Sequence, residues 1–248
     1  MTNIMEKMSK LFFMGQAGYV FKSKSGQTLG IDFYLSNCLA AGDPVGFHRL
    51  MPEIFKPEEI IVDNLIATHF HRDHFDIDAM PKLMDNRVTK LICAYDCQRD
   101  VERLNIEPSR VTYVSPGDHL VRGDFDITII KCDHGQQAPL AVGVIIEFDG
   151  KRIVEVGDTC LHLDWKDEYL KRGPIDILIA PINGAWGNLN EQENVELAKA
   201  LQPGLSIPCH FGMCPAHHGD PGLWMDLMKQ QIPNQKYQFM TLGEGLEL

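Results

Sequence analysis

Apolar residues fall in short runs separated by turn-forming residues, a pattern typical of an α/β protein. Near the N-terminus, Tyr19–Lys22 and Leu29–Phe33 flank a Gly26-Gln27 turn and predict a hairpin. Strand-like and helix-like segments then alternate. The predicted order is strand 65–68, helix 78–84, strand 91–94, helix 98–104 and strand 111–114.

The second half repeats this arrangement. Strands are predicted at 125–131, 141–148 and 152–156, and Asp149-Gly150 between the last two is a strong hairpin signal. Asn190 followed by Glu193 predicts a capped helix start. The remaining predictions are strands 175–182 and 205–208, helix 223–230 and a terminal strand 237–242. Because no Ser/Gly linker separates the halves, we expect one domain over residues 1–248, built from two similar halves.

Composition narrows the class of protein. The chain has 248 residues, 44% of them hydrophobic, and its formal charge is −11. A globular core is therefore expected, whereas long nucleic acids and membranes are not expected as partners. Residues 1–10 lack the apolar run of an export signal. Seven cysteines, an odd number, favour reduced thiols over a set of disulfides. A cytoplasmic location is therefore predicted. Assembly into a homo-oligomer stays open.

The strongest chemical signal is the motif His69-x-His71-x-Asp73-His74, directly after a predicted strand. Composition alone would produce this pattern in roughly one such chain in a thousand. In extended backbone His69 and His71 point to the same side and can share an ion, while Asp73 and His74 can face a second one. The alternative is a surface loop of hydrogen-bonded histidines, which is disfavoured because clustering imidazoles without a metal costs desolvation.

Three further donors follow predicted strands, where α/β sheets tend to place binding groups: His134, Asp158 and His210. With the first motif they fill the donor set that two ions require. His48, His119 and His162 have no ligand-like context, so we expect ordinary loop or surface positions for them.

These motifs, and their order along the chain, resemble those of the metallo-β-lactamase-fold hydrolases. The resemblance implies a four-layer αββα sandwich. It also implies that His69, His71 and His134 hold one ion, that Asp73, His74 and His210 hold the other, and that Asp158 bridges them. Asp32, on an early strand, would orient the metal loop through hydrogen bonds. Segments 14–18, 180–184 and 207–211 are most similar to the L-ascorbate 6-phosphate lactonase-like group.

The predicted function is a metal-dependent hydrolase in which a metal-bridging hydroxide attacks a small anionic, carbohydrate-derived lactone or ester. Asp73 and Asp158 would position that hydroxide and relay its proton. The cofactors would be two divalent ions, Mn²⁺ or Zn²⁺. Two alternatives stay open: a phosphodiesterase or nuclease of the same fold, and a metal-binding protein without enzymatic activity.

Four residues are candidates for contact with the substrate. Arg72 lies inside the metal motif and would neutralise an anion, although a surface-facing arginine is an equal alternative. Asn183 lies in a lactonase-like segment, and His217 and His218 follow His210 by a short loop. The sequence leaves the choice between contact with substrate and exposure to solvent open for both histidines.

Overall fold

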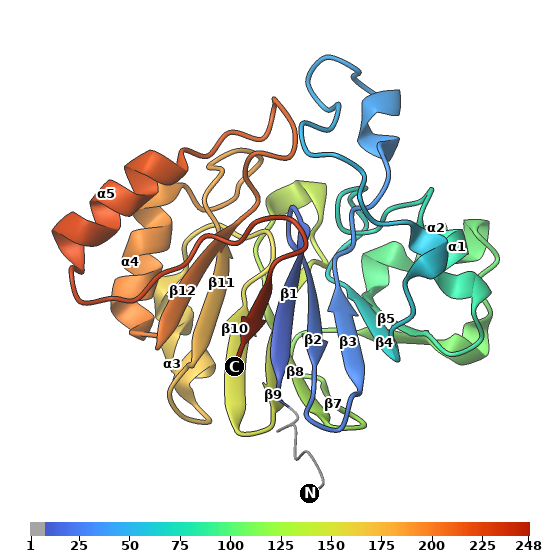
Figure 1. The fold of residues 1–248 in the computed structure, drawn as a ribbon, viewed down its shortest axis with the longest axis horizontal. Coiled ribbons are helices and arrows are strands. Elements are labelled where there is room, and N and C mark those ends of the chain that lie inside the picture. Colours follow the sequence, from blue (N-terminus) through green and yellow to red (C-terminus); the bar gives the residue numbers. More distant parts are fainter. Residues whose placement is uncertain (1–7) are drawn as a thin grey trace, which may run out of the picture.

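The computed structural model describes residues 8–248 and places two mixed β-sheets face to face (Figure 1). Residues 1–7, and with them most of the N-terminal segment used to predict a cytoplasmic location, lie outside the described residues. In spatial order the first sheet consists of β13 (Gly245–Glu247), β1 (Lys10–Gly15), β2 (Gly18–Lys22), β3 (Thr28–Ile31), β4 (Asn64–Ala67), β5 (Lys90–Ala94) and β6 (Val111–Val114). The second consists of β12 (Leu205–Cys209), β11 (Ile177–Pro181), β10 (Lys151–Glu155), β9 (Val142–Phe148), β8 (Phe125–Lys131) and β7 (His119–Arg122).

Helices cover the outer faces of both sheets (Figure 1). The α-helices are α1 (Met80–Asp85), α2 (Gln98–Arg103), α3 (Lys166–Leu170), α4 (Glu191–Leu201) and α5 (Pro221–Gln231). Apolar side chains of α1 and α2 pack on β4 and β5, and those of α3 and α4 pack on β10 and β11. A third apolar cluster fills the space between the sheets. The predicted αββα sandwich is therefore confirmed.

Local signals located most elements correctly. Asp149 and Gly150 have φ angles of 51° and 81°, as a tight hairpin turn requires, and they join β9 to β10. The Asn190 side chain accepts from Glu193 N, and the Glu193 side chain accepts from Asn190 N, so the predicted capping box starts α4. In each sheet antiparallel strands are followed by parallel ones, which matches the two similar halves.

The predicted terminal strand 237–242 is wrong. Tyr237 makes only an isolated bridge to Ser206, and the strand near the C-terminus is instead β13, paired with β1. The apolar residues of 237–242 serve as packing groups: Tyr237 and Phe239 contact Trp224 of α5. Strands β1 and β7 were not predicted, and β7 alternates exposed and half-buried residues without a strong apolar run.

No helix within residues 8–248 is both long enough and apolar enough to cross a membrane. Each of the described helices has eleven residues or fewer.

One buried carboxyl group is poorly accommodated by this packing. Glu155 ends β10 with 1% of its surface exposed, and neither carboxyl oxygen has a hydrogen-bond partner among the described residues. Burial, followed by the nearby Asp32 carboxylate, raises the pKa of Glu155 well above its usual value. Between the unfolded-state and folded-state pKa values of such a group, the folded chain keeps a proton that the unfolded chain loses. Its contribution to stability is therefore fully present below the unfolded-state pKa and is lost as pH rises toward the folded-state pKa.

We expect Glu155→Gln to raise the free energy of unfolding at neutral pH, because glutamine keeps the shape and does not have to take up a proton when the chain folds. For the wild type, the Glu155 contribution should fall by about 1.4 kcal/mol per pH unit above the unfolded pKa. Urea unfolding between pH 5 and about 8 measures both effects, with pH bounds set by the usual stability range of proteins. An equal pH dependence in both proteins would contradict this expectation.

Candidate metal centre

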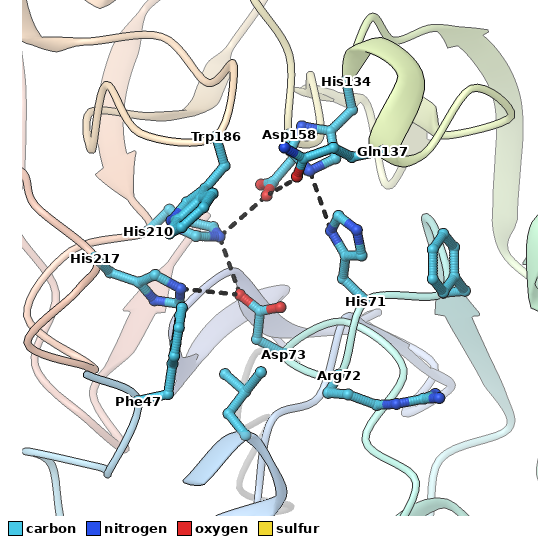
Figure 2. Close-up of a pocket in the computed structure, with 12 residues that line it drawn as sticks. Phe47, His71, Arg72, Asp73, His134, Gln137, Asp158, Trp186, His210 and His217 are labelled. Carbon is cyan, nitrogen blue, oxygen red and sulfur yellow. Dashed lines mark hydrogen bonds and ion pairs between the residues drawn. The ribbon is translucent and has the colours of Figure 1, made fainter. Parts of the chain in front are cut away.

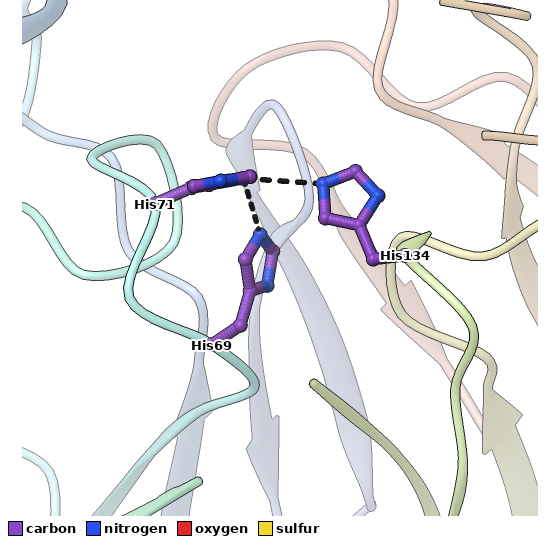
Figure 3. A group of neighbouring side chains, drawn as sticks. All are labelled: His69, His71 and His134. Atoms are coloured by element: carbon purple, nitrogen blue, oxygen red, sulfur yellow. Dashed lines mark hydrogen bonds between the residues drawn. The ribbon is translucent and has the colours of Figure 1, made fainter. Parts of the chain in front are cut away.

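Seven of the predicted donors converge where strands of both sheets end. Residues 69–74 follow β4 of the first sheet. His134 follows β8, Asp158 follows β10 and His210 follows β12, all in the second sheet. We call the group the metal centre: His69, His71, Asp73, His74, His134, Asp158 and His210. Figure 2 and Figure 3 together label all of these residues except His74.

His69, His71 and His134 form the first half of this centre (Figure 3). The His71 Nδ1 atom lies 3.0 Å from His69 Nε2 and 3.1 Å from His134 Nε2. Burial lowers the pKa of all three rings, that of His71 to about 4, so they are neutral near pH 7. Three neutral imidazoles that direct nitrogens at one point are suitable ligands for a divalent ion. The donor set therefore fits a metal.

The second half contains Asp73 and His210, with Asp158 between the two halves (Figure 2). His210 Nε2 lies 3.2 Å from Asp73 Oδ2 and 3.1 Å from Asp158 Oδ2. The same Asp158 oxygen lies 3.3 Å from His74 Nε2 and 3.8 Å from His134 Nε2. Burial alone would lower the pKa of His210, but Asp158 and Asp73 raise it to about 9. In the metal-free chain His210 therefore holds a proton that a divalent ion would displace.

Asp32 contacts the histidine-rich loop at residues 68–74. Its carboxylate accepts from Thr68 N at 2.8 Å and lies 2.6 Å from His74 Nδ1. This contact holds the ring so that Nε2 faces Asp158. Asp32 itself is fully buried and has a φ angle of 46°, in the left-handed region.

Gln16 is a part of the site that sequence reasoning missed. Its Nε2 atom donates to Asp73 Oδ2 at 2.8 Å and lies 2.8 Å from His217 Nδ1. Gln16 is fully buried, and its Oε1 atom has no hydrogen-bond partner among residues 8–248. Gln16 lies in segment 14–18, which resembles the lactonase-like group. A single glutamine outside any pattern of metal donors did not identify it as a site residue.

Backbone strain is concentrated around the centre. In the described part of the chain seven non-glycine residues have a positive φ, and four of them surround this site: Gln16, Asp32, Trp186 and His210. Such conformations cost roughly 1–3 kcal/mol each and persist where the surrounding structure enforces them. Their clustering is consistent with a functional site.

A pocket of about 240 Å³ opens beside the centre and is lined in part by apolar residues. Leu39, Phe47, Phe70 and Trp186 line it, and the Phe47 and Trp186 rings lie 6.0 Å apart. Arg72 is the one lysine or arginine among the lining residues described, and it points away from the Asp73 carboxylate (Figure 2). Its guanidinium donates to both carboxylate oxygens of Asp100 on α2, at 2.7 and 3.2 Å.

The other substrate candidates have different positions. His217 is buried, lines the pocket and has its Nε2 atom 3.8 Å from Asp73 Oδ2, so it also lies within reach of an ion held by Asp73 and His210. His218 is exposed, and neither it nor the buried Asn183 lines the pocket. Asn183 instead pairs with Asn190 in an isolated bridge at the start of α4.

The chain matches the family model of the beta-lactamase superfamily domain over residues 10–210. It belongs to this superfamily. Two curated relatives, from Desulfitobacterium hafniense (strain Y51) and Pyrococcus abyssi, are each 26% identical to it and are named UPF0173 metal-dependent hydrolases. The alignments cover 94% and 97% of this chain and 96% and 100% of the relatives.

Two solved structures share the fold. A metallo hydrolase from Ignicoccus hospitalis has a TM-score of 0.76 at 19% identity, covering 97% of this chain and 98% of that one. An isothiocyanate hydrolase from Delia radicum gut bacteria has a TM-score of 0.75 at 16% identity, covering 96% and 98%. The family match and the curated relatives together support a metal-dependent hydrolase of the metallo-β-lactamase fold.

We expect the metal centre to bind two ions. After loading with Zn²⁺ or Mn²⁺, wild type and the variant His71→Ala/His210→Ala should differ by about two ions per chain in elemental analysis. The control His48→Ala/His119→Ala removes two exposed histidines outside the centre and should keep the wild-type metal content. A difference near zero between wild type and the first variant would refute this assignment.

Gln16→Ala should weaken metal binding about 10–100-fold, because it removes the donor that fixes Asp73. Competition with a chelator measures the change. Gln137→Ala is the matched control, since Gln137 lines the same pocket but is exposed. Equal metal affinity of the two variants would show that the Gln16 contact does not hold the donor.

Proposed function

We propose that this chain hydrolyses a small carboxylic ester or lactone at a two-metal centre. One observation carries the proposal: Asp158 Oδ2 lies between the imidazoles of both halves of the centre, and Asp158 also lines the adjoining pocket. A carboxylate in that position can bind both ions and face a substrate at the same time. The relatives named metal-dependent hydrolases support hydrolysis as the reaction.

Divalent ions at this centre would supply an activated water and a Lewis acid for the carbonyl oxygen. The chain's own residues orient and deprotonate that water. Although burial alone would raise the pKa values of Asp73 and Asp158, neighbouring histidines hold both well below the usual range. Both carboxylates are therefore ionised, as ligands and hydrogen-bond acceptors that orient this water must be. Asp158, which lines the pocket, would relay the proton that the activated water releases to the departing alkoxide.

The pocket favours a substrate with an uncharged, apolar portion next to the reacting carbonyl. Phe47 and Trp186 offer ring surfaces on one side. Burial lowers the pKa of His217 to about 4, so this ring is neutral near pH 7. Arg72 is paired with Asp100, a carboxylate that Arg103 also contacts, and it is directed away from the centre. The phosphorylated sugar lactone expected from the sequence would thus find little positive charge apart from the ions.

A phosphodiesterase would use the same ions, but a nucleic-acid strand is normally held by several lysines and arginines along a groove. With one arginine among the described residues of this pocket, and that one paired, the ester or lactone has better support.

The test compares four substrates at equal metal concentration: an uncharged aromatic ester, an uncharged γ-lactone, a sugar-lactone phosphate and a bis-aryl phosphodiester. We expect the first two to have the highest kcat/KM, and Asp158→Asn to lower turnover by about 100-fold or more. Asp167→Asn, an exposed carboxylate on α3, is the control. Preferred cleavage of the phosphodiester would overturn the proposal, and preference for the phosphorylated lactone would overturn the uncharged-substrate part of it.

A further inference from the structure

A second group of metal-ligating side chains lies outside the pocket lining: Asp133, Cys160 and His162. His162 Nε2 lies 2.9 Å from Asp133 Oδ2, and Cys160 Sγ lies 3.4 Å from the same oxygen. All three donor atoms lie within 4.8 Å of one another. Sequence spacing did not identify His162 as a ligand, because Asp133 lies 29 residues away and Cys160 has no paired-cysteine spacing.

Two hydrogen bonds donated by backbone amides hold together the two loops that carry these donors. Cys160 N donates to Asp133 O at 3.0 Å, and Asp133 N donates to Thr159 Oγ1 at 3.0 Å. The separation of the Asp133 and Cys160 side chains is therefore set by the main chain. A hydrogen-bonded frame of this kind supplies the preorganisation that a metal site requires.

The His162 ring is oriented from two sides. Its Nδ1 atom lies 3.3 Å from Asp164 Oδ1, and the ring stacks on Trp165 at a centroid distance of 3.9 Å. A carboxylate on one ring nitrogen with the other nitrogen directed at a ligand group is the usual environment of a metal-binding histidine. Asp133 Oδ1 accepts from Gly135 N, which directs Oδ2 toward Cys160 and His162.

The donor types select the metal. A thiolate, an imidazole and a carboxylate together suit Zn²⁺, and the thiolate disfavours Mn²⁺ and Mg²⁺. Bonds of about 2.0–2.3 Å to a tetrahedral ion place ligand atoms roughly 3–4 Å apart, close to the observed separations. A simple ion pair between Asp133 and His162 would not require the thiol.

We propose that Asp133, Cys160 and His162 form a separate zinc site, with water as the fourth ligand. The site would act as a clamp between two loops of the metal centre. Asp133 directly precedes His134, and Cys160 follows Asp158 by two residues. An ion bound there fixes the distance between these loops without contacting the substrate pocket. The proposal is independent of the substrate and of the reaction.

Cobalt provides a direct test, since a thiolate ligand gives Co²⁺ an intense near-ultraviolet charge-transfer absorption and the metal centre contains no cysteine. The metal-stripped full chain is titrated with Co²⁺ and its spectrum followed. We expect the thiolate band in wild type and in His71→Ala/His210→Ala, and its loss in Cys160→Ser. Cys132→Ser is the matched control, because Cys132 lies beside Asp133 and donates to Asp158 O, outside the proposed donor set; it should keep the band.

A second measurement needs no substitution. Zn²⁺ should slow alkylation of Cys160 by iodoacetamide about tenfold or more, as measured by mass spectrometry of the Cys160 peptide. Absence of the cobalt band in wild type, its survival in Cys160→Ser, its loss in Cys132→Ser, or unchanged alkylation with Zn²⁺ would each overturn the proposal. The variant His71→Ala/His210→Ala lacks two donors of the metal centre, so a thiolate band in this variant reports on the proposed zinc site. The result therefore does not depend on whether the proposed hydrolysis occurs.

Discussion

The burial of Asp32 beneath the histidine-rich loop is the interaction on which the site depends. Its carboxylate accepts from the Thr68 amide and contacts His74 Nδ1, so one buried charge fixes both the start of the loop and a ring within it. The charge is tolerated because its lone pairs are used. Asp32 extends from the end of β3, and its left-handed backbone turns the chain directly after that strand. The first sheet thereby positions half of the centre.

The second sheet supplies the other half of the metal centre. Two carboxyl groups near the end of β10 differ in the partners that surround them. Asp158 lies among histidines, which keep it ionised, whereas Glu155, three residues earlier, lies between the sheets without a partner among the described residues. The contrast follows from position: Glu155 is the last residue of β10 and lies on the same side of the strand as Ile153, toward the apolar cluster between the sheets, whereas Asp158 lies beyond the strand in the loop at the polar edge. Moving a donor inward by a few residues changes a ligand into a source of instability.

The pocket and the two candidate metal sites share the same loops. His134 and Asp158 face the metal centre, while Asp133 and Cys160, beside them in the chain, meet His162 outside the pocket lining. Neighbouring residues in an irregular or extended segment can direct their side chains to different sides, so one pair of loops can serve two groups of ligands. The shared backbone would be sufficient to couple the proposed zinc site to the metal centre.

The sequence by itself determined the local features. Apolar runs and turn residues located most strands, Asp149-Gly150 marked a hairpin, and Asn190 with Glu193 marked the start of α4, because these signals depend on residues only a few positions apart. The spacing of His69, His71, Asp73 and His74 predicted metal chemistry for the same reason.

The tertiary structure alone decided which distant residues meet. Gln16 reaches Asp73 across 57 residues and His210 across 194, Arg72 pairs with Asp100, and Asp133 lies beside Cys160 and His162. It also decided that 237–242 packs on Trp224 while β13 pairs with β1. Such contacts depend on the order of strands in the sheets, and periodicity along the chain carries no information about that order.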